Sequence, residues 1–429
     1  MIQPAAPDTP ETPDTPASMR ILLLVNQFPP DVNPAGKLMH ALARGLVMRG
    51  HRVHVVTAFP HYAEFRIWPE YRRRWWQHTL EDGVCVTRLR VFASGQKQRM
   101  GHRLASYVSY NAAAFLAAHS STAEFDVMLA PNGSFFTGLT AAALGALRRI
   151  PFVYNVQDVY PDVPARAGQL PSATQVQWLE RIERFMYRAA EHVTVIAESQ
   201  RDNLLAKRVS AGKLSVIPNF VDVERIQPQA PDEELRARLG WTDRFVVVHS
   251  GNLGFAYDFD TLLQAARLML KEPQTLFVII GDGVRKPELV QRAQSLGLGN
   301  VQFLPFQPEA DLPRLRASAH VQLSLYRPGA SRLSLPSKLY EIMAAAQPIL
   351  ASAEPDSDVA HLVQHAGAGL MVEPDQPEQL VAAVRALREA PAMRQQLGER
   401  GRAHVSAHHS LRSALDAYEA LLWRCSRQR

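Results

Sequence analysis

The sequence predicts an α/β protein with two Rossmann-like, doubly wound domains that face each other across a cleft. Three observations lead to this prediction. The chain has 429 residues, more than one ordinary core accommodates. From Arg20 onward, short β-branched runs alternate with longer helical periods. After a stretch rich in Pro, Gln and acids at 219–243, the same alternation begins again.

The first half opens with a strand, a helix and a strand, in the runs RILLLV, GKLMHALARGLVMRG and HRVHVVTA. Further strands are predicted at 84–92, 125–130, 152–156, 192–196 and 214–217, with helices between most of them, which favours a parallel sheet. In the second half, helical segments separate the runs FVVVHSG, TLFVIIGDG, VQFLPF, VQLSLY, PILASA and GLMVEP. The predicted domains are therefore 19–218 and 219–405. A disordered Pro- and Thr-rich tail at 1–18 precedes them, and a helix at 406–429 packs back toward the first domain.

Composition limits the classes of function. Lys and Arg total 47 against 41 Asp and Glu, and the net charge of +6 favours phosphate ligands or an anionic surface without requiring nucleic acid. The two cysteines, Cys85 and Cys425, have neither disulfide-framework nor metal-ligand spacing. The first residues do not form a secretory signal, and no apolar run is long enough to span a membrane. We therefore expect a cytoplasmic protein.

The first turn after a strand, NQFPPDVNPAGKLMH at 26–40, lacks the GxGxxG spacing that seats a dinucleotide pyrophosphate. This argues against a nicotinamide-dependent dehydrogenase. Gly36 stands just before a helix whose free amides can face a phosphate or a sugar. A simple helix start with no ligand explains the same residues.

The most informative stretch is LSLPSKLYEIMAAAQPILA at 333–351. Pro336 suits a first helical turn, so that Ser337 and Lys338 lie beside the positive end of a helix, where a diphosphate can bind. Glu341, one turn further, has two acceptor oxygens for the two hydroxyls of a ribose. Alternatively, Lys338 and Glu341 form a solvated ion pair on a helix that buries its apolar face.

Two strand ends carry glycines. Gly251, Asn252 and Gly254 follow a predicted strand at a point where backbone can approach a ligand closely. Gly281 and Gly283 end the run FVIIGDG in the same manner. A tight structural turn explains these residues as well as a ligand contact does.

Asp158 comes two residues after the predicted strand at 152–156, at the end where the cleft is expected. A carboxylate in this position can orient an acceptor hydroxyl and act as its general base. The alternative is a turn or helix-capping role for Asp158 or Asp162.

Residues 65–83 combine arginine with tryptophan, notably at Arg72, Arg73, Arg74, Trp75 and Trp76. This combination is typical of a membrane interface, where the charge meets head groups and the indole lies at the boundary. The segment could also pack on the sheet, or its arginines could bind an acceptor diphosphate.

Together and in this order, the segments resemble glycosyltransferase family 4, and within it the bacterial L-fucosamine and colanic acid type transferases. The resemblance runs from about residue 19 to the C-terminal helices. It rests on FPPDVNPAGKLMHALARGLVMRGHRVHVVTAFPHY, QDVYPDV, HSGNLG with DTLLQAA, FVIIGDGVRKPEL, VQFLP and LPSKLYEIMAAAQPILAS.

The resemblance implies a GT-B fold and a retaining, metal-independent transfer from a nucleotide diphosphate sugar. The implied acceptor is a saccharide on a polyprenyl diphosphate at the inner face of the cytoplasmic membrane. Glu341 would hold the donor ribose. The turn at Gly254 and the segment of Ser337 and Lys338 would hold the diphosphate. Gly36 would lie on the donor side of its loop, and Asp158 matches an acceptor-side polar position.

The chain departs from the family in two places. Many relatives have two glutamates eight positions apart, and here Leu333, followed by Ser334, stands at the first of these positions. Many relatives also have an Arg and a Lys after the first strand of the second domain, where this chain has Asn252 and Tyr257. The charge for the donor phosphates must then come from other residues, and the candidates are Lys338, Arg327 and Arg332.

These features predict a hexosyltransferase of surface polysaccharide synthesis, such as that of O-antigen, capsule or exopolysaccharide, with no cofactor and no metal. A nucleotide-sugar epimerase of the same fold would need no lipid acceptor and would leave the Arg and Trp segment without a role. A non-catalytic nucleotide-sugar-binding scaffold stays open because a glutamate is missing at Leu333. A two-lobed extracytoplasmic binding protein would need an export signal.

Overall fold

A computed structural model describes residues 18–31, 33–96, 99–160, 162, 173–332 and 335–427. The chain divides into two compact units. The first unit takes the described residues of Met1–Asn155, Ala189–His192 and Glu419–Arg429, and the second takes those of Val156–Arg188 and Val193–Tyr418. The predicted disordered tail lies outside the described residues except for Ser18, whose hydroxyl donates to the carbonyl oxygen of Gly50 (2.8 Å).

Eight strands form the first sheet, in the order β3-β4-β2-β1-β5-β6-β7-β8. Their bounds are β1 (Arg20–Leu24), β2 (Arg52–Ala58), β3 (Trp76–Glu81), β4 (Val84–Leu89), β5 (Val127–Pro131), β6 (Phe152–Val156), β7 (His192–Val195) and β8 (Leu214–Val216). Strands β1, β5, β6 and β7 have few or no exposed residues, which explains why their sequences are mostly apolar without a polar face.

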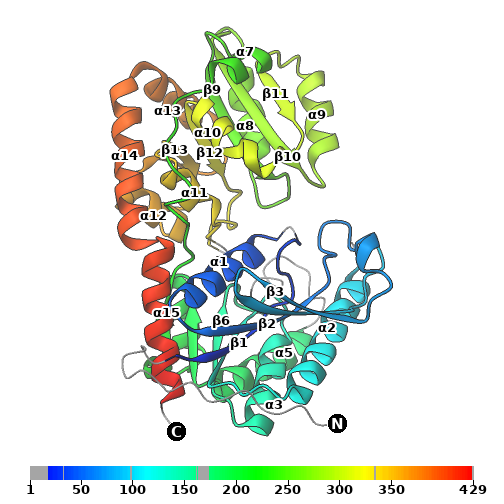
Figure 1. Ribbon diagram of the computed structural model, residues 1–429. Helices are drawn as coiled ribbons and strands as arrows, with labels where there is room; N and C mark the ends of the chain where they lie inside the picture. The colour runs from blue at the N-terminus through cyan, green and yellow to red at the C-terminus, as the bar shows by residue number, and fades with distance from the viewer. Residues whose placement is uncertain are drawn as a thin grey trace. The chain divides into compact units, whose positions relative to one another are not determined.

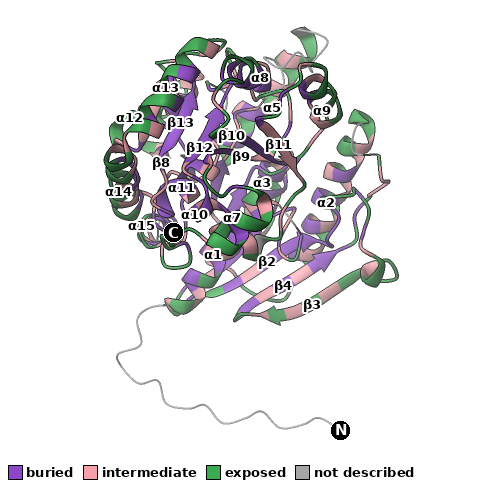
Figure 2. Ribbon diagram, turned by 90° about the horizontal axis from the view of Figure 1, so that it is seen from above, coloured by how far each residue is buried: buried purple, intermediate pink, exposed green. Residues whose placement is uncertain are grey.

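The edge of the first sheet departs from the predicted parallel arrangement. Strand β3 pairs with β4 in the antiparallel sense, with Trp76 opposite Leu89 and Glu81 opposite Val84. No strand was predicted at β3, because the sequence WQHTLE lacks an apolar face. Its residues are exposed or half-buried, as Figure 2 shows. The sheet is therefore parallel with one antiparallel edge strand.

Helices accompany the strands of the first sheet. They are α1 (Pro34–Met48), η1 (Pro69–Tyr71), α2 (Met100–Ser120), α3 (Thr137–Arg148), α5 (Ala173–Ala189), α6 (Glu198–Ala206) and η2 (Ala211–Lys213). Figure 1 shows α1 and the pair α2 and α3 on different sides of β1 and β2. Helix α1 begins after Asn33, whose side chain accepts a hydrogen bond from the amide of Gly36 (3.1 Å).

Six parallel strands form the second sheet, in the order β11-β10-β9-β12-β13-β14. They are β9 (Phe245–Asn252), β10 (Thr275–Asp282), β11 (Val301–Leu304), β12 (Val321–Leu325), β13 (Ile349–Ser352) and β14 (Gly369–Val372). The helices are α7 (Glu233–Leu239), α8 (Phe259–Leu268), α9 (Lys286–Ser295), η3 (Glu309–Asp311), α10 (Leu312–Ser318), α11 (Lys338–Ala344), α12 (Asp358–Ala366), α13 (Pro377–Glu389), α14 (Pro391–His408) and α15 (Leu411–Ser426).

The second sheet has an apolar core built from strand and helix side chains. Asp258 caps α8 by accepting a hydrogen bond from the amide of Thr261 (3.0 Å). The helix then buries Leu262 and Leu263 against the sheet. Strands β12 and β13 are buried along their length (Figure 2). This core fixes the ends of β9 and β10, where the sequence analysis placed ligand contacts.

The end of the chain belongs to the first unit. In α15, Glu419 accepts hydrogen bonds from Arg49 (2.6 Å) and lies 2.9 Å from His51 Nε2. All strands of the first sheet precede residue 217, and all strands of the second follow residue 244. The bounds 19–218, 219–405 and 406–429 stay predictions. None of the described helices combines the length and apolar character that crossing a membrane requires.

Candidate functional site

The ends of β9 and β10 lie side by side, with Gly281 paired with Gly251 and Asp282 paired with Asn252. A Cβ atom on Gly281 would lie 1.9 Å from the carbonyl oxygen of Gly251, and one on Gly283 would lie 2.5 Å from that of Leu253. Both glycines also have positive φ angles, 143° and 158°. The close approach of the two turns therefore accounts for Gly281 and Gly283 without a ligand.

Gly254 differs from these two glycines. A Cβ atom there would meet only the side chain of Asn252, 3.0 Å from its Nδ2. A Cβ atom on Gly251 would meet nothing within 4 Å, and Asn252 is exposed. This turn, which leads from β9 to α8, is thus the one with backbone accessible to a ligand, and its role in donor binding stays a prediction.

Lys338 occupies an unusual environment at the start of α11. Its side chain is half-buried, but the Nζ atom is covered and has no hydrogen-bond partner among the described residues. Nζ lies 4.4 Å from the centroid of the Tyr257 ring. Burial lowers the pKa of Lys338 to about 7. An enclosed ammonium without a partner is costly, so this atom is suited to receive an anion.

Two aromatic residues complete the surroundings of Lys338. The ring of His249, on β9, lies 5.0 Å from that of Tyr257 in an edge-on arrangement. Burial, followed by the charge of Lys338, lowers the pKa of His249 well below its usual value, so His249 is neutral at pH 7. His249 was not among the residues predicted for the site. Its only signal was its place in the run HSGNLG.

Glu341 does not pair with Lys338. It forms an ion pair through Oε2 with Arg316 of α10, and its side chain keeps 39% of its surface exposed. The solvated pair of Lys338 and Glu341, which the sequence left open, is therefore absent. Ser337 precedes the helix, and its side chain makes no capping hydrogen bond.

The two arginines considered for the donor phosphates already have carboxylate partners. Arg327 Nη2 lies 2.6 Å from Asp260, which also pairs with Arg285 and Arg292. Burial alone would raise the pKa of Asp260, but its arginine partners hold it below the usual value. Arg332 pairs with Asp356 (2.7 Å) on the surface. Of the three candidate cations, Lys338 alone lacks a counter-ion among the described residues. Leu333 and Ser334, where many relatives have a glutamate, lie outside the described residues.

Asp158 follows β6 in a half-buried position. Burial raises the pKa of its carboxyl, which strengthens it as a base. The sequence left open a turn or helix-capping role for Asp162 as well. Asp162 accepts hydrogen bonds from Asn203 (2.8 Å) and Lys207 (2.6 Å), and is thus a structural residue.

Two segments of the chain match the models of known protein families. Residues 231–404 match the model for glycosyl transferases group 1, and residues 35–219 match the glycosyl transferase 4-like domain. The chain belongs to the GT-B glycosyltransferases. The predicted fold class and enzyme class are thereby confirmed.

Individual relatives agree with this assignment. The glycosyltransferase is 27% identical to WcaI of Escherichia coli (strain K12), named as a colanic acid biosynthesis glycosyl transferase, over 86% of this chain and 91% of that protein. Its fold matches Anabaena Alr3699/HepE in complex with UDP, with a TM-score of 0.71 at 19% identity, covering 95% and 100% of the two chains. Sucrose-phosphate synthase from Thermosynechococcus elongatus matches with a TM-score of 0.72 at 17% identity, covering 95% and 98%.

In the glycosyltransferase, Gly36 has a packing reason of its own. A Cβ atom at this position would lie 2.6 Å from the carbonyl oxygen of Gln27, so only glycine lets α1 approach the preceding loop. The amide of Gly36 is already bonded to Asn33. The helix start considered in the sequence analysis accounts for this residue, and donor contact at Gly36 stays a prediction.

The Arg and Trp segment of the glycosyltransferase faces solvent. Trp75 and Trp76 keep 75% and 67% of their surface exposed, and the three arginines Arg72, Arg73 and Arg74 are exposed as well. The guanidinium of Arg90 lies over the Trp75 ring, 5.0 Å from its centroid. Part of the segment does belong to the sheet, because Trp76 begins β3 and Phe65 and Ile67 are buried, but the two indole rings remain exposed.

Proposed function

We propose that the protein transfers a sugar from a nucleotide diphosphate sugar to a saccharide carried on a polyprenyl diphosphate, in the synthesis of a bacterial surface polysaccharide. We further propose a retaining reaction of the family 4 type that needs no metal. The diphosphate binds at Lys338 and at the turn of Asn252 and Gly254, and the ribose hydroxyls bind Glu341.

The observation that carries this proposal is the enclosed Nζ of Lys338 without a hydrogen-bond partner in the described part of the chain. A diphosphate brings the negative charge and the acceptor oxygens that this ammonium lacks. As the glycosidic bond of the donor breaks, negative charge grows on the leaving diphosphate. A fixed cation beside it stabilises that charge, which is the role a metal has in other transferases.

The relatives support the biological setting. WcaI is named for colanic acid biosynthesis, and HepE has been crystallised with UDP and with UDP-glucose. Asp158, with the raised pKa of its carboxyl, is the proposed general base on the acceptor side. In this proposal the Lys338 ammonium supplies the positive charge that faces the phosphates.

The exposed surface of Arg72, Arg73, Arg74, Trp75 and Trp76 supports a peripheral position at the inner face of the cytoplasmic membrane. Indole rings insert at the lipid boundary, while guanidinium groups bind anionic head groups. A lipid-linked acceptor is presented at such a surface.

Binding of UDP, GDP, ADP, CMP and dTDP, each with and without EDTA, tests the donor site. We expect one nucleotide to raise the melting temperature selectively, with no effect of EDTA. The increase should vanish in Lys338→Met and persist in Lys271→Met, which removes an exposed lysine of the same unit. A shift that EDTA abolishes would overturn metal independence. Absence of any shift would overturn the proposed donor site.

Sedimentation with vesicles tests the membrane surface. We expect the double substitution Trp75→Ser, Trp76→Ser to release the protein from vesicles that contain phosphatidylglycerol. Leu147→Ser removes an apolar side chain of α3 that is 61% exposed, and should have no effect. If both proteins sediment like the wild type, the surface does not bind membranes.

A further inference from the structure

A second cationic region lies away from Lys338, in a hollow of about 640 Å³ between α5 and the segment that follows α6. The residues around it include five basic side chains and no acidic one. They are Arg184, Tyr187, Arg188, Ala206, Lys207, Arg208, Val209, Ser210 and Lys213. We call this hollow the basic pocket. Its volume is in the range of small-molecule sites.

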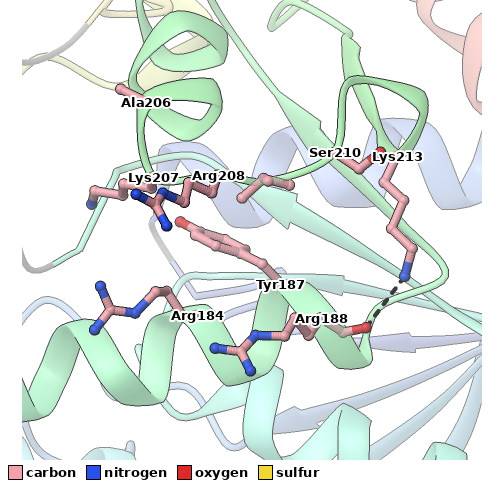
Figure 3. A pocket seen from close by; sticks show the side chains of 9 residues that line it. Arg184, Tyr187, Arg188, Ala206, Lys207, Arg208, Ser210 and Lys213 are labelled. Carbon is pink, nitrogen blue, oxygen red and sulfur yellow. Dashed lines mark hydrogen bonds between the residues drawn. The ribbon is translucent and has the colours of Figure 1, made fainter.

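Two elements supply the cations of the basic pocket from different sides. Figure 3 shows Arg184 and Arg188 extending from α5, Lys207 and Arg208 from the end of α6, and the Tyr187 ring between them. The Tyr187 hydroxyl donates to Glu183 (2.8 Å), so the ring is held in place at the base. The pocket is therefore bounded by α5 on one side and by the segment after α6 on the other, with the buried Tyr187 ring between them.

The five cations are not equivalent. Lys207 is neutralised, because its Nζ lies 2.6 Å from Asp162 and 2.9 Å from Glu183. In contrast, the guanidinium groups of Arg184, Arg188 and Arg208 have no ion-pair partner among the residues that the structure describes. Like charges gathered around one hollow repel one another, and an anion bound among them removes that repulsion.

The backbone of Arg208 makes its side chain easy to test. Arg208 follows α6 with a φ angle of 65°, in the left-handed region where glycine is favoured. The hydrogen bonds from the amides of Arg208 to Leu205 and of Val209 to Leu204 close the helix there. An arginine at such a position costs about 1 kcal/mol relative to glycine. A glycine at position 208 would therefore suit the backbone and remove only the side chain.

We propose that the basic pocket binds a phosphate or diphosphate group, with Arg184, Arg188 and Arg208 as its ligands. Guanidinium groups bind phosphate oxygens through paired hydrogen bonds, and three of them match a group with several charged oxygens. The group belongs either to a soluble phosphorylated compound or to a lipid head group. This site is separate from the proposed donor site and does not depend on it.

Arg208→Gly gives a test that separates binding from folding. Because glycine suits the backbone at this position, we expect the variant to melt at the same temperature as the wild type or higher. Its affinity for pyrophosphate, measured by calorimetry, should fall roughly tenfold or more. Arg149→Gly is the matched control, since Arg149 is exposed, has a φ of 56° at the end of α3 and lies outside the pocket.

Further variants complete the test. Arg184→Gln with Arg188→Gln should weaken pyrophosphate binding as Arg208→Gly does. The same titration in Lys338→Met protein identifies the binding that does not come from the proposed donor site. The proposal is overturned if Arg208→Gly and the double variant bind pyrophosphate as tightly as Arg149→Gly does, or if Lys338→Met abolishes all binding.

Vesicles distinguish the two sources of phosphate. Trp178 and Phe185, on the same helix as Arg184, are 62% and 54% exposed, so this helix can meet a lipid surface. Weaker sedimentation of Arg208→Gly than of Arg149→Gly with phosphatidylglycerol vesicles assigns the pocket to a lipid head group. Equal sedimentation of the two variants, with loss of pyrophosphate binding in Arg208→Gly, assigns it to a soluble ligand.

Discussion

Lys338 and Arg332 are both cations beside the second sheet, and the sequence presented them as equal candidates for binding phosphate. The structure separates them. Arg332 is exposed and paired with Asp356, whereas Lys338 is enclosed and has no counter-ion among the described residues. The difference teaches that the presence of a positive charge near a predicted site does not make it available. Availability depends on whether the protein itself already neutralises the charge.

The largest effect that this comparison predicts is that of Lys338→Met. We expect nucleotide affinity to fall about a hundredfold or more, because the diphosphate loses its enclosed cation. Folding should not suffer, since the substitution removes a charge from a covered position. Calorimetric titration and thermal melting measure the two quantities. Unchanged affinity would show that Lys338 is enclosed for structural reasons only.

A second prediction extends the comparison to the glycines. Gly281→Ala should destabilise the fold by roughly 3 kcal/mol, because a Cβ atom there meets backbone and the φ angle is positive. Gly254→Ala should cost about 1 kcal/mol or less, because only the Asn252 side chain must move. Urea unfolding of both variants measures the difference. Equal losses would contradict the distinction between a packing turn and a ligand turn.

The pH dependence of stability and of nucleotide binding tests whether the charge of Lys338 holds the diphosphate. The pKa of Lys338 is about 7 in the folded protein and 10.5 in the unfolded chain. Between these values the unfolded chain binds more protons, so the free energy of unfolding should rise with pH. A diphosphate requires the charged amine, so affinity should fall by up to about tenfold per pH unit above pH 7. Both slopes should disappear in Lys338→Met, and persistent slopes would point to another group.

The smallest effect is expected at Arg332. Arg332→Gln breaks an exposed ion pair with Asp356, and such pairs contribute about 0 to 1 kcal/mol. Nucleotide affinity should therefore change less than about threefold. A loss as large as that of Lys338→Met would mean that a ligand displaces Asp356, and that a neutralised cation can still serve the donor.

Much of the fold could be predicted from the sequence, since its signals are local. The predicted strand at 152–156 is observed as β6, and the predicted strands at 84–92 and 214–217 differ from β4 and β8 only at their ends. These strands are largely covered, so they appear as short apolar runs. The edge strand β3 could not be predicted because its residues alternate between exposed and half-buried, without an apolar face.

The candidate site was predictable only in part. The position of Lys338 at a helix start follows from Pro336, but its enclosure depends on Tyr257, which is distant in the sequence. The same is true of the pairs between Arg316 and Glu341 and between Arg327 and Asp260. Side-chain partners of this kind are decided by packing, and a pattern along one chain contains no record of them. The basic pocket was missed because its cations come from separate segments.

Helix α15 has a practical consequence. It starts in the second unit and finishes in the first, where Glu419 holds Arg49 and lies beside His51. The first unit is therefore not one continuous stretch of sequence. An exchange of residues 19–218 with a related enzyme would separate these partners unless residues 419–427 moved with them. We therefore expect hybrids between relatives to fold when both residues 19–218 and residues 419–427 come from the same parent protein.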